Sequence, residues 1–303
     1  MGSVSYSYNI SQFEVTNTQY TGFLNAADPT GANTRHLYNS YMGDYHGNIA
    51  FTGGIDYAPG APVGAKYSVK SGQALKPVIW VDWYDAARFA NWLNNGQGNG
   101  STEAGAYDMT QTYPTRSAGA TFFLPTEHEW YKSAYYQPQA AGGDTDNYWF
   151  YPTRSNTAPY SDNPSSLEFP GNSADYYNDD GNNANGYNDG FALSGSTTFN
   201  PAGNLTDVGA YGDTRSYYGL CDLAGNVGEW NETWITNGNL KYSGIRGGGW
   251  DSVAFEFQSS YRYPALQPTD ETFNIGFRVA NLPEPHCTLI LIVPCVLASR
   301  RRG

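Results

Sequence analysis

Cysteine is scarce in this chain. Three of the 303 residues are cysteine, and two of them, Cys287 and Cys295, lie close to the C-terminal end. Extracellular proteins with too little hydrophobic core often depend on several disulfides, which need a larger set of cysteines. A disulfide framework therefore does not support this fold.

Positive charge is also sparse. Lys and Arg number 16 against 28 Asp and Glu, which gives a formal net charge of −12. Proteins that hold nucleic acid without regard to its sequence neutralise phosphates with Lys and Arg. We therefore expect no nucleic-acid partner, and cations are the better-suited small ligands.

The sequence also has few stretches free of Gly and Pro that could form long helices or strands. The chain contains 35 Gly and 17 Pro, which end helices and strands and build turns. Aromatic residues nevertheless make up 16% of it, with 26 Tyr and 8 Trp. This combination predicts a loop-rich fold with little regular structure and a core built largely from aromatic rings.

Three short stretches do have the apolar spacing and start signals of helices. The predicted helices are residues 17–25, 83–94 and 127–135. Asp82 caps the second, and Thr126 with Glu129 forms the capping box of the third. Residues 1–10 alternate in the manner of a strand.

Five segments, taken in order, resemble the formylglycine-generating enzyme (sulfatase-modifying factor) family. They are Phe13–Tyr20, Pro77–Ala86, Leu124–Trp130, Tyr217–Trp230, and Ile245–Trp250 with Asn274–Arg278. The fourth is the most specific, because it is similar to the family signature Gly-Leu-Tyr-Asp-Met-x-Gly-Asn-Val-Trp-Glu-Trp. The resemblance implies a single α+β domain over residues 1–282, with the loop-rich, C-type-lectin-like fold of that family and low regular secondary structure.

The last segment, residues 283–303, resembles a PEP-CTERM sorting signal. A Pro-Glu-Pro motif is followed by an apolar run and then by Arg300–Arg302. The apolar run is short for a membrane span, and Pro294 interrupts it. The resemblance implies a bacterial protein handled by exosortase-type sorting machinery, with membrane contact through this segment before processing.

Such a signal also implies export to the cell surface or extracellular matrix. Export requires an N-terminal signal peptide with a basic start and an apolar stretch. Residues 1–10 have neither, so we expect the true start to lie upstream. A cytoplasmic protein with an accidental apolar tail is the alternative.

The family resemblance also implies two calcium sites, in acidic loops of the kind that suit this cation. In the family, the first site uses an Asn side chain, the carbonyl of the next residue, an Asp fourteen residues later and a carbonyl two residues beyond that. The matching donors are the side chains of Asp175 and Asp189 and the carbonyls of Tyr176 and Phe191. The alternative is a solvated loop without a cation.

The second implied calcium site lies in the loop before the Glu-Trp pair. The matching donors are the side chains of Asp222 and Glu229 and the carbonyls of Gly225 and Val227. The alternative is that the two carboxylates only cap turns or pair with an arginine, Arg246 or Arg278.

The catalytic members of the family bind Cu(I) through two cysteines that lie five residues apart, and thiolates suit this soft ion. The corresponding positions, counted from the Gly-Gly-Gly-Trp segment, are Ser252 and Phe257. Cys221 stands where the family has an aromatic residue or Met. We therefore expect no copper and no catalytic residue of this type, although an enzymatic role stays open.

These features favour an exported, calcium-stabilised and non-catalytic surface or binding protein with a sulfatase-modifying-factor fold. Its ligand would be a glycan or a protein bound by an aromatic-rich face. Two alternatives remain at this point. One is a formylglycine-generating-type oxidoreductase acting on protein cysteine, and the other is a structural component of the extracellular matrix.

Overall fold

The computed structural model describes residues 1–43, 53–182, 184–199, 204–238, 240–263 and 266–283. In this part of the chain, three α-helices of 9 to 12 residues are joined by long loops and short strands. Two strands, β9 (Gly228–Asn237) and β10 (Leu240–Arg246), are longer than three residues. The predicted α+β, loop-rich fold is confirmed.

Each α-helix begins with a capping box. The side chain of the residue before the helix accepts a hydrogen bond from a backbone amide in the first turn, and the side chain of that first-turn residue accepts one from the backbone amide of the capping residue. The helices are α1 (Asn17–Ala27), α2 (Trp83–Asn94) and α3 (Glu127–Tyr135). The capping pairs are Thr16 with Gln19, Asp82 with Asp85, and Thr126 with Glu129. All three predicted helices are present, and α1 extends two residues beyond its predicted end.

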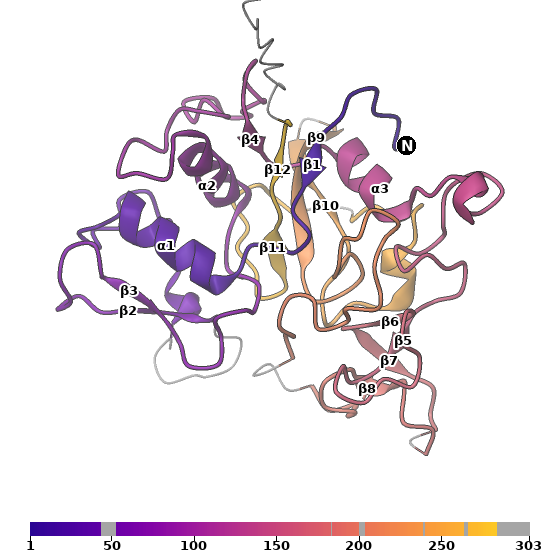
Figure 1. Ribbon diagram of the computed structural model, residues 1–303. Coiled ribbons are helices and arrows are strands. Elements are labelled where there is room, and N and C mark those ends of the chain that lie inside the picture. The colour runs from indigo at the N-terminus through magenta and orange to yellow at the C-terminus, as the bar shows by residue number, and fades with distance from the viewer. Residues whose placement is uncertain (44–52, 183, 200–203, 239, 264–265, 284–303) are drawn as a thin grey trace, which may run out of the picture.

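Two three-stranded sheets lie at the centre of the molecule (Figure 1). In the first, β12 (Ala280–Asn281) pairs with β1 (Asn9–Ile10) on one side and β4 (Phe122–Phe123) on the other. In the second, β9 pairs antiparallel with β10 and parallel with β11 (Ile275–Phe277). Residues 1–10 were expected to alternate as a strand, but the strand is limited to β1, because only there does β12 offer a partner.

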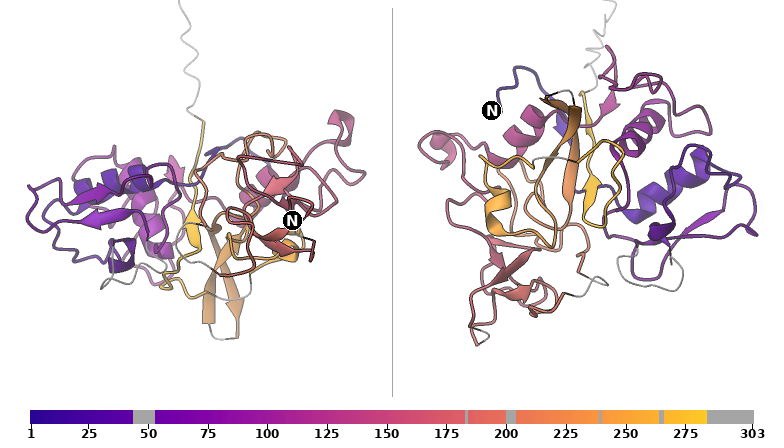
Figure 2. Two further views of the ribbon diagram at one scale, coloured as in Figure 1. Left: turned by 90° about the horizontal axis from the view of Figure 1, so that it is seen from below. Right: turned by 180° about the vertical axis from the view of Figure 1, so that it is seen from behind.

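Smaller elements flank the centre. They are the strand pairs β2 (Ile55–Tyr57) with β3 (Tyr67–Val69), β5 (Tyr160–Ser161) with β6 (Ser173–Ala174), and β7 (Tyr177–Asp179) with β8 (Asp189–Phe191), and the 3-10 turns η1 (Ser40–Met42), η2 (Gln139–Ala141) and η3 (Ala254–Phe257). Figures 1 and 2 show α1, α2, β2 and β3 on one side of the central strands and α3 with β5 to β8 on the other.

Aromatic rings fill the main core between α1, α2 and the central strands. Tyr20 and Phe23 of α1 meet Phe89 of α2, and Phe89 meets Phe277 of β11, with ring centroids 5.2 to 6.4 Å apart across this group. Such ring pairs add to the stabilisation that comes from burying their area. The aromatic core expected from the composition is therefore present.

The segment expected to act as a sorting signal lies almost entirely outside the described residues, which end at Pro283. Among the residues described, no helix has both the length and the apolar character needed to cross a membrane.

Candidate functional site

Ser252 lies two residues before η3, Phe257 is the last residue of η3, and both side chains lie beside Gly248. The Ser252 hydroxyl accepts a hydrogen bond from the Gly249 amide at 3.0 Å. Phe257 is fully buried and meets the ring of Tyr176 edge to face, 5.0 Å between centroids. A Cβ placed on Gly248 would lie 2.6 Å from the Phe257 ring and 2.9 Å from the Ser252 hydroxyl. The two positions therefore lie side by side, but a hydroxyl and a phenyl ring do not fit Cu(I).

Glu229, a predicted calcium ligand, is fully buried in β9 and bound to an arginine. Its two oxygens accept hydrogen bonds from Nε and Nη2 of Arg278, both at 2.6 Å, and Oε2 also accepts from Nε1 of Trp130 at 2.7 Å. Arg278 is equally inaccessible to solvent. This is the arginine contact that the sequence left open as an alternative. Glu229 could bind calcium only by giving up part of this contact.

The loop before β9 carries Asp222 and Gly225 of the second predicted site, and it contacts Asp175 of the first. Oδ2 of Asp222 accepts from the Gly209 amide at 2.5 Å, and burial raises the pKa of Asp222 to about 6. Gly225, at φ 79°, packs so tightly that a Cβ would lie 1.9 Å from the carbonyl oxygen of Asp175. Only glycine fits there. Val227 follows, fully buried. Gly225 of the second set thus lies directly against Asp175 of the first.

The first predicted set is divided between two places. Asp175 is buried and accepts from the Thr206 amide at 3.2 Å, and burial raises its pKa to about 8. Asp189 opens β8 and pairs with Asp179 of β7, four residues further along the chain than Asp175. The structure therefore does not give these two carboxylates a common contact.

The two carbonyls of that set already accept hydrogen bonds within the protein. The Tyr176 carbonyl accepts from the Ser161 hydroxyl at 2.7 Å and from the Ala192 amide at 3.2 Å. The Phe191 carbonyl accepts from the amides of Ser194 and Gly195. Each carbonyl oxygen has two lone pairs, so these bonds use its acceptor capacity.

Asp189 instead shares a pocket with Asp162. Both line a hollow of about 200 Å³, and each has one buried oxygen, Oδ1, with no hydrogen-bond partner in the described structure. A buried carboxylate oxygen without a partner is costly, and a cation would satisfy it. In the described part of the chain, no three or more His, Cys, Asp and Glu side chains gather in a way that could hold a metal, so a calcium ion here would also need carbonyls or water. Asp162 lies outside every family segment, which is why the sequence did not indicate it.

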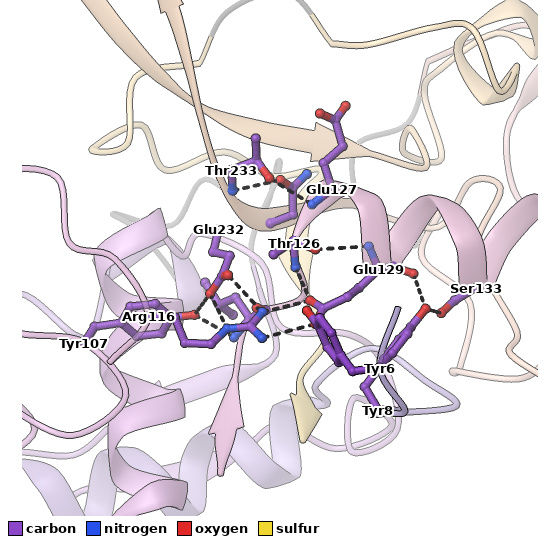
Figure 3. A network of polar contacts seen from close by, with 12 residues as sticks. Tyr6, Tyr8, Tyr107, Arg116, Thr126, Glu127, Glu129, Ser133, Glu232 and Thr233 are labelled. Carbon is purple, nitrogen blue, oxygen red and sulfur yellow. Dashed lines mark hydrogen bonds and ion pairs between the residues drawn. The ribbon is translucent and has the colours of Figure 1, made fainter. Parts of the chain in front are cut away.

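A second polar network surrounds the start of α3 (Figure 3). Arg116 donates to Oε2 of Glu129 at 2.8 Å and to Oε2 of Glu232 at 3.0 Å. Although burial opposes it, the bonded guanidinium of Arg116 lowers the pKa of Glu129 below its ordinary value. The hydroxyls of Tyr6 and Tyr8 donate to the side chain and the carbonyl of Glu129, each at 2.7 Å. The sequence did not predict this network, because it joins residues far apart in the chain, such as Tyr6 and Glu129, which are 123 positions apart.

Similarity to the solved structure of CarF supports the fold. CarF aligns with 91% of this chain and 87% of its own, at 20% identity and a TM-score of 0.53. Treponema denticola variable protein 1 (18% identity, TM-score 0.46) and PvdO from Pseudomonas aeruginosa (17%, 0.41) each align with 91% of this chain and with 84% and 80% of their own. A comparison with functionally curated proteins found no match.

The sequence itself matches a known domain over nearly its whole length. The matching description is the sulfatase-modifying factor enzyme 1-like domain, and the match covers residues 3–282. These limits contain all five of the segments on which the resemblance rested. The chain therefore belongs to the sulfatase-modifying factor enzyme 1-like family.

Proposed function

We propose that this chain is an exported, calcium-stabilised, non-catalytic surface or binding protein that uses the sulfatase-modifying-factor fold as a scaffold. The observation that carries the proposal is the pair Ser252 and Phe257. The two side chains meet beside Gly248, where the family resemblance places two copper-binding cysteines.

Neither side chain can take over the role of a thiolate. The Ser252 hydroxyl is held by the Gly249 amide in a tight turn, and the Phe257 ring packs into the core against Tyr176. Cu(I) prefers soft sulfur ligands, which a neutral hydroxyl and an aromatic ring do not replace. Cys221 is buried, and burial raises the pKa of its thiol, which disfavours the thiolate form.

Calcium stabilisation is best supported at Asp189. Asp189 and Asp162 line one pocket, each has a buried oxygen without a hydrogen-bond partner, and carboxylate oxygens suit this cation. Export rests on the resemblance of residues 283–303 to a sorting signal, and the acidic surface agrees with an extracellular location.

The experiment that tests the proposal is a cysteine-peptide oxidation assay with copper-loaded protein. Cys287 and Cys295 are both replaced by Ser, so that the C-terminal thiols cannot supply stray ligands. We expect no turnover and no tight Cu(I) binding. Ser252→Cys combined with Phe257→Cys should create Cu(I) affinity in the same background, because the two side chains converge. The protein with native Ser252 and Phe257 is also tested with Cys221→Ser added. Turnover by that variant would overturn the non-catalytic proposal and favour the oxidoreductase alternative.

A further inference from the structure

A second pocket, distant in sequence from Ser252 and Phe257, opens between the N-terminal segment and α3. Its volume is about 400 Å³, within the range of pockets that hold small ligands. Among the residues that line it are Tyr6, Tyr8, Lys132, Ser133 and Tyr218. Aromatic rings and polar groups therefore line the same pocket.

One wall of this pocket is held rigidly. The Tyr8 hydroxyl donates to the Glu129 carbonyl at 2.7 Å and lies 2.9 Å from the Ser133 hydroxyl. The Tyr6 hydroxyl donates to the Glu129 carboxylate, which Arg116 anchors in turn (Figure 3). A wall fixed in this way loses little freedom when a ligand binds, which favours affinity.

The pocket is also lined by a tyrosine that solvent reaches. Tyr218 is 47% exposed, as is Tyr6. The Tyr218 ring lies nearly parallel to that of Tyr136, 6.4 Å between centroids, and Tyr136 continues to Tyr148 at 5.2 Å. Large rings left half exposed beside a pocket provide flat apolar contact area and a polar tip, as binding surfaces do.

The polar groups and the charge of the chain narrow the class of ligand. Lys132 donates to the Val4 carbonyl at 3.2 Å, and an ammonium has three protons, so two are left for a ligand. The net charge of −12 disfavours a polymer with dense negative charge. A sugar ring has a flat apolar face surrounded by hydroxyl groups. Such a face can pack on a tyrosine ring while its hydroxyls bond to the polar groups that line the pocket.

We propose that this pocket is a glycan-binding site, in which a sugar ring packs on Tyr218 and Tyr6 and Lys132 contacts a hydroxyl or a single carboxylate. The inference rests on the proposed function as a binding protein and names its site and ligand class. It assigns no role to Ser252, Phe257 or a metal.

The test is isothermal titration of the full chain with di- to tetrasaccharides, with and without one uronic acid. The variants are Tyr218→Ala and Lys132→Gln. Tyr57→Ala is the control, because Tyr57 is 38% exposed and lies on β2, outside this pocket. Thermal melts confirm that each variant is folded. We expect Tyr218→Ala to weaken binding about tenfold, Lys132→Gln to reduce any preference for the uronic acid, and the control to bind as the parent does.

Two results would overturn the inference. One is a folded parent protein that binds none of these saccharides at millimolar concentration. The other is saccharide binding that Tyr218→Ala leaves unchanged, which would place the sugar elsewhere. Both differ from failure of the proposed function, which would appear as copper-dependent oxidation of cysteine peptides whatever the result with sugars.

Discussion

At the scale of single residues, the buried ion pair of Glu229 and Arg278 decides whether Glu229 stabilises the fold or binds calcium. Both are inaccessible to solvent and joined by two bonds of 2.6 Å. Removing one partner of a buried pair leaves an uncompensated charge, which typically costs about 3–5 kcal/mol. We expect Glu229→Gln to lower the free energy of unfolding by about this amount, measured by urea denaturation.

Glu168→Gln is the matched control, because Glu168 is exposed, and its effect should stay within about 0.5 kcal/mol. The comparison also separates the two interpretations of Glu229. An ion-pair role predicts the same loss with and without a calcium chelator. A loss that appears only in calcium would contradict the ion-pair role and return Glu229 to the second predicted calcium site.

At the scale of elements, the start of α3 links the fold to the proposed sugar pocket. Thr126 accepts from the Glu129 amide at 3.0 Å, and Glu129 in turn holds Tyr6 and Arg116. Loss of an N-cap side chain costs about 1 kcal/mol. We therefore expect Thr126→Ala to lower the free energy of unfolding by about 1 kcal/mol and to weaken saccharide binding, because the Tyr6 wall loses part of its anchor.

Thr198→Ala serves as the control for this element, since Thr198 is exposed and lies in a loop far along the chain from α3. If Thr126→Ala changes stability but leaves saccharide binding unaltered, then Glu129 keeps its position without the cap. The link between α3 and the pocket wall would then be wrong.

The same scale shows how far the sequence predicts the structure. Helices α1 to α3 were predictable, because caps and apolar spacing are local signals. Strands of two residues, such as β1, were not, because alternation needs a longer run and the partner of Ile10 is Ala280. The convergence of Ser252 and Phe257 followed from the family segments, whereas Asp162 and the tyrosine pocket depend on contacts between distant parts of the chain.

At the scale of the whole molecule, a fold with long loops and short strands depends for its stability on a few strong interactions, and a bound cation would be one of them. A cation that binds only the folded state stabilises it by mass action, by about 2.7 kcal/mol at a concentration one hundred times its dissociation constant. We expect the melting temperature to fall on chelation of calcium and Asp189→Asn to remove most of that response, because the unpaired oxygen of Asp189 is the best-supported ligand. Asp213→Asn, at an exposed position, should leave the response intact.

An unchanged melting temperature in excess chelator would contradict calcium stabilisation at both predicted sites. A response abolished by Asp189→Asn and kept in Glu229→Gln would place the cation in the pocket shared with Asp162.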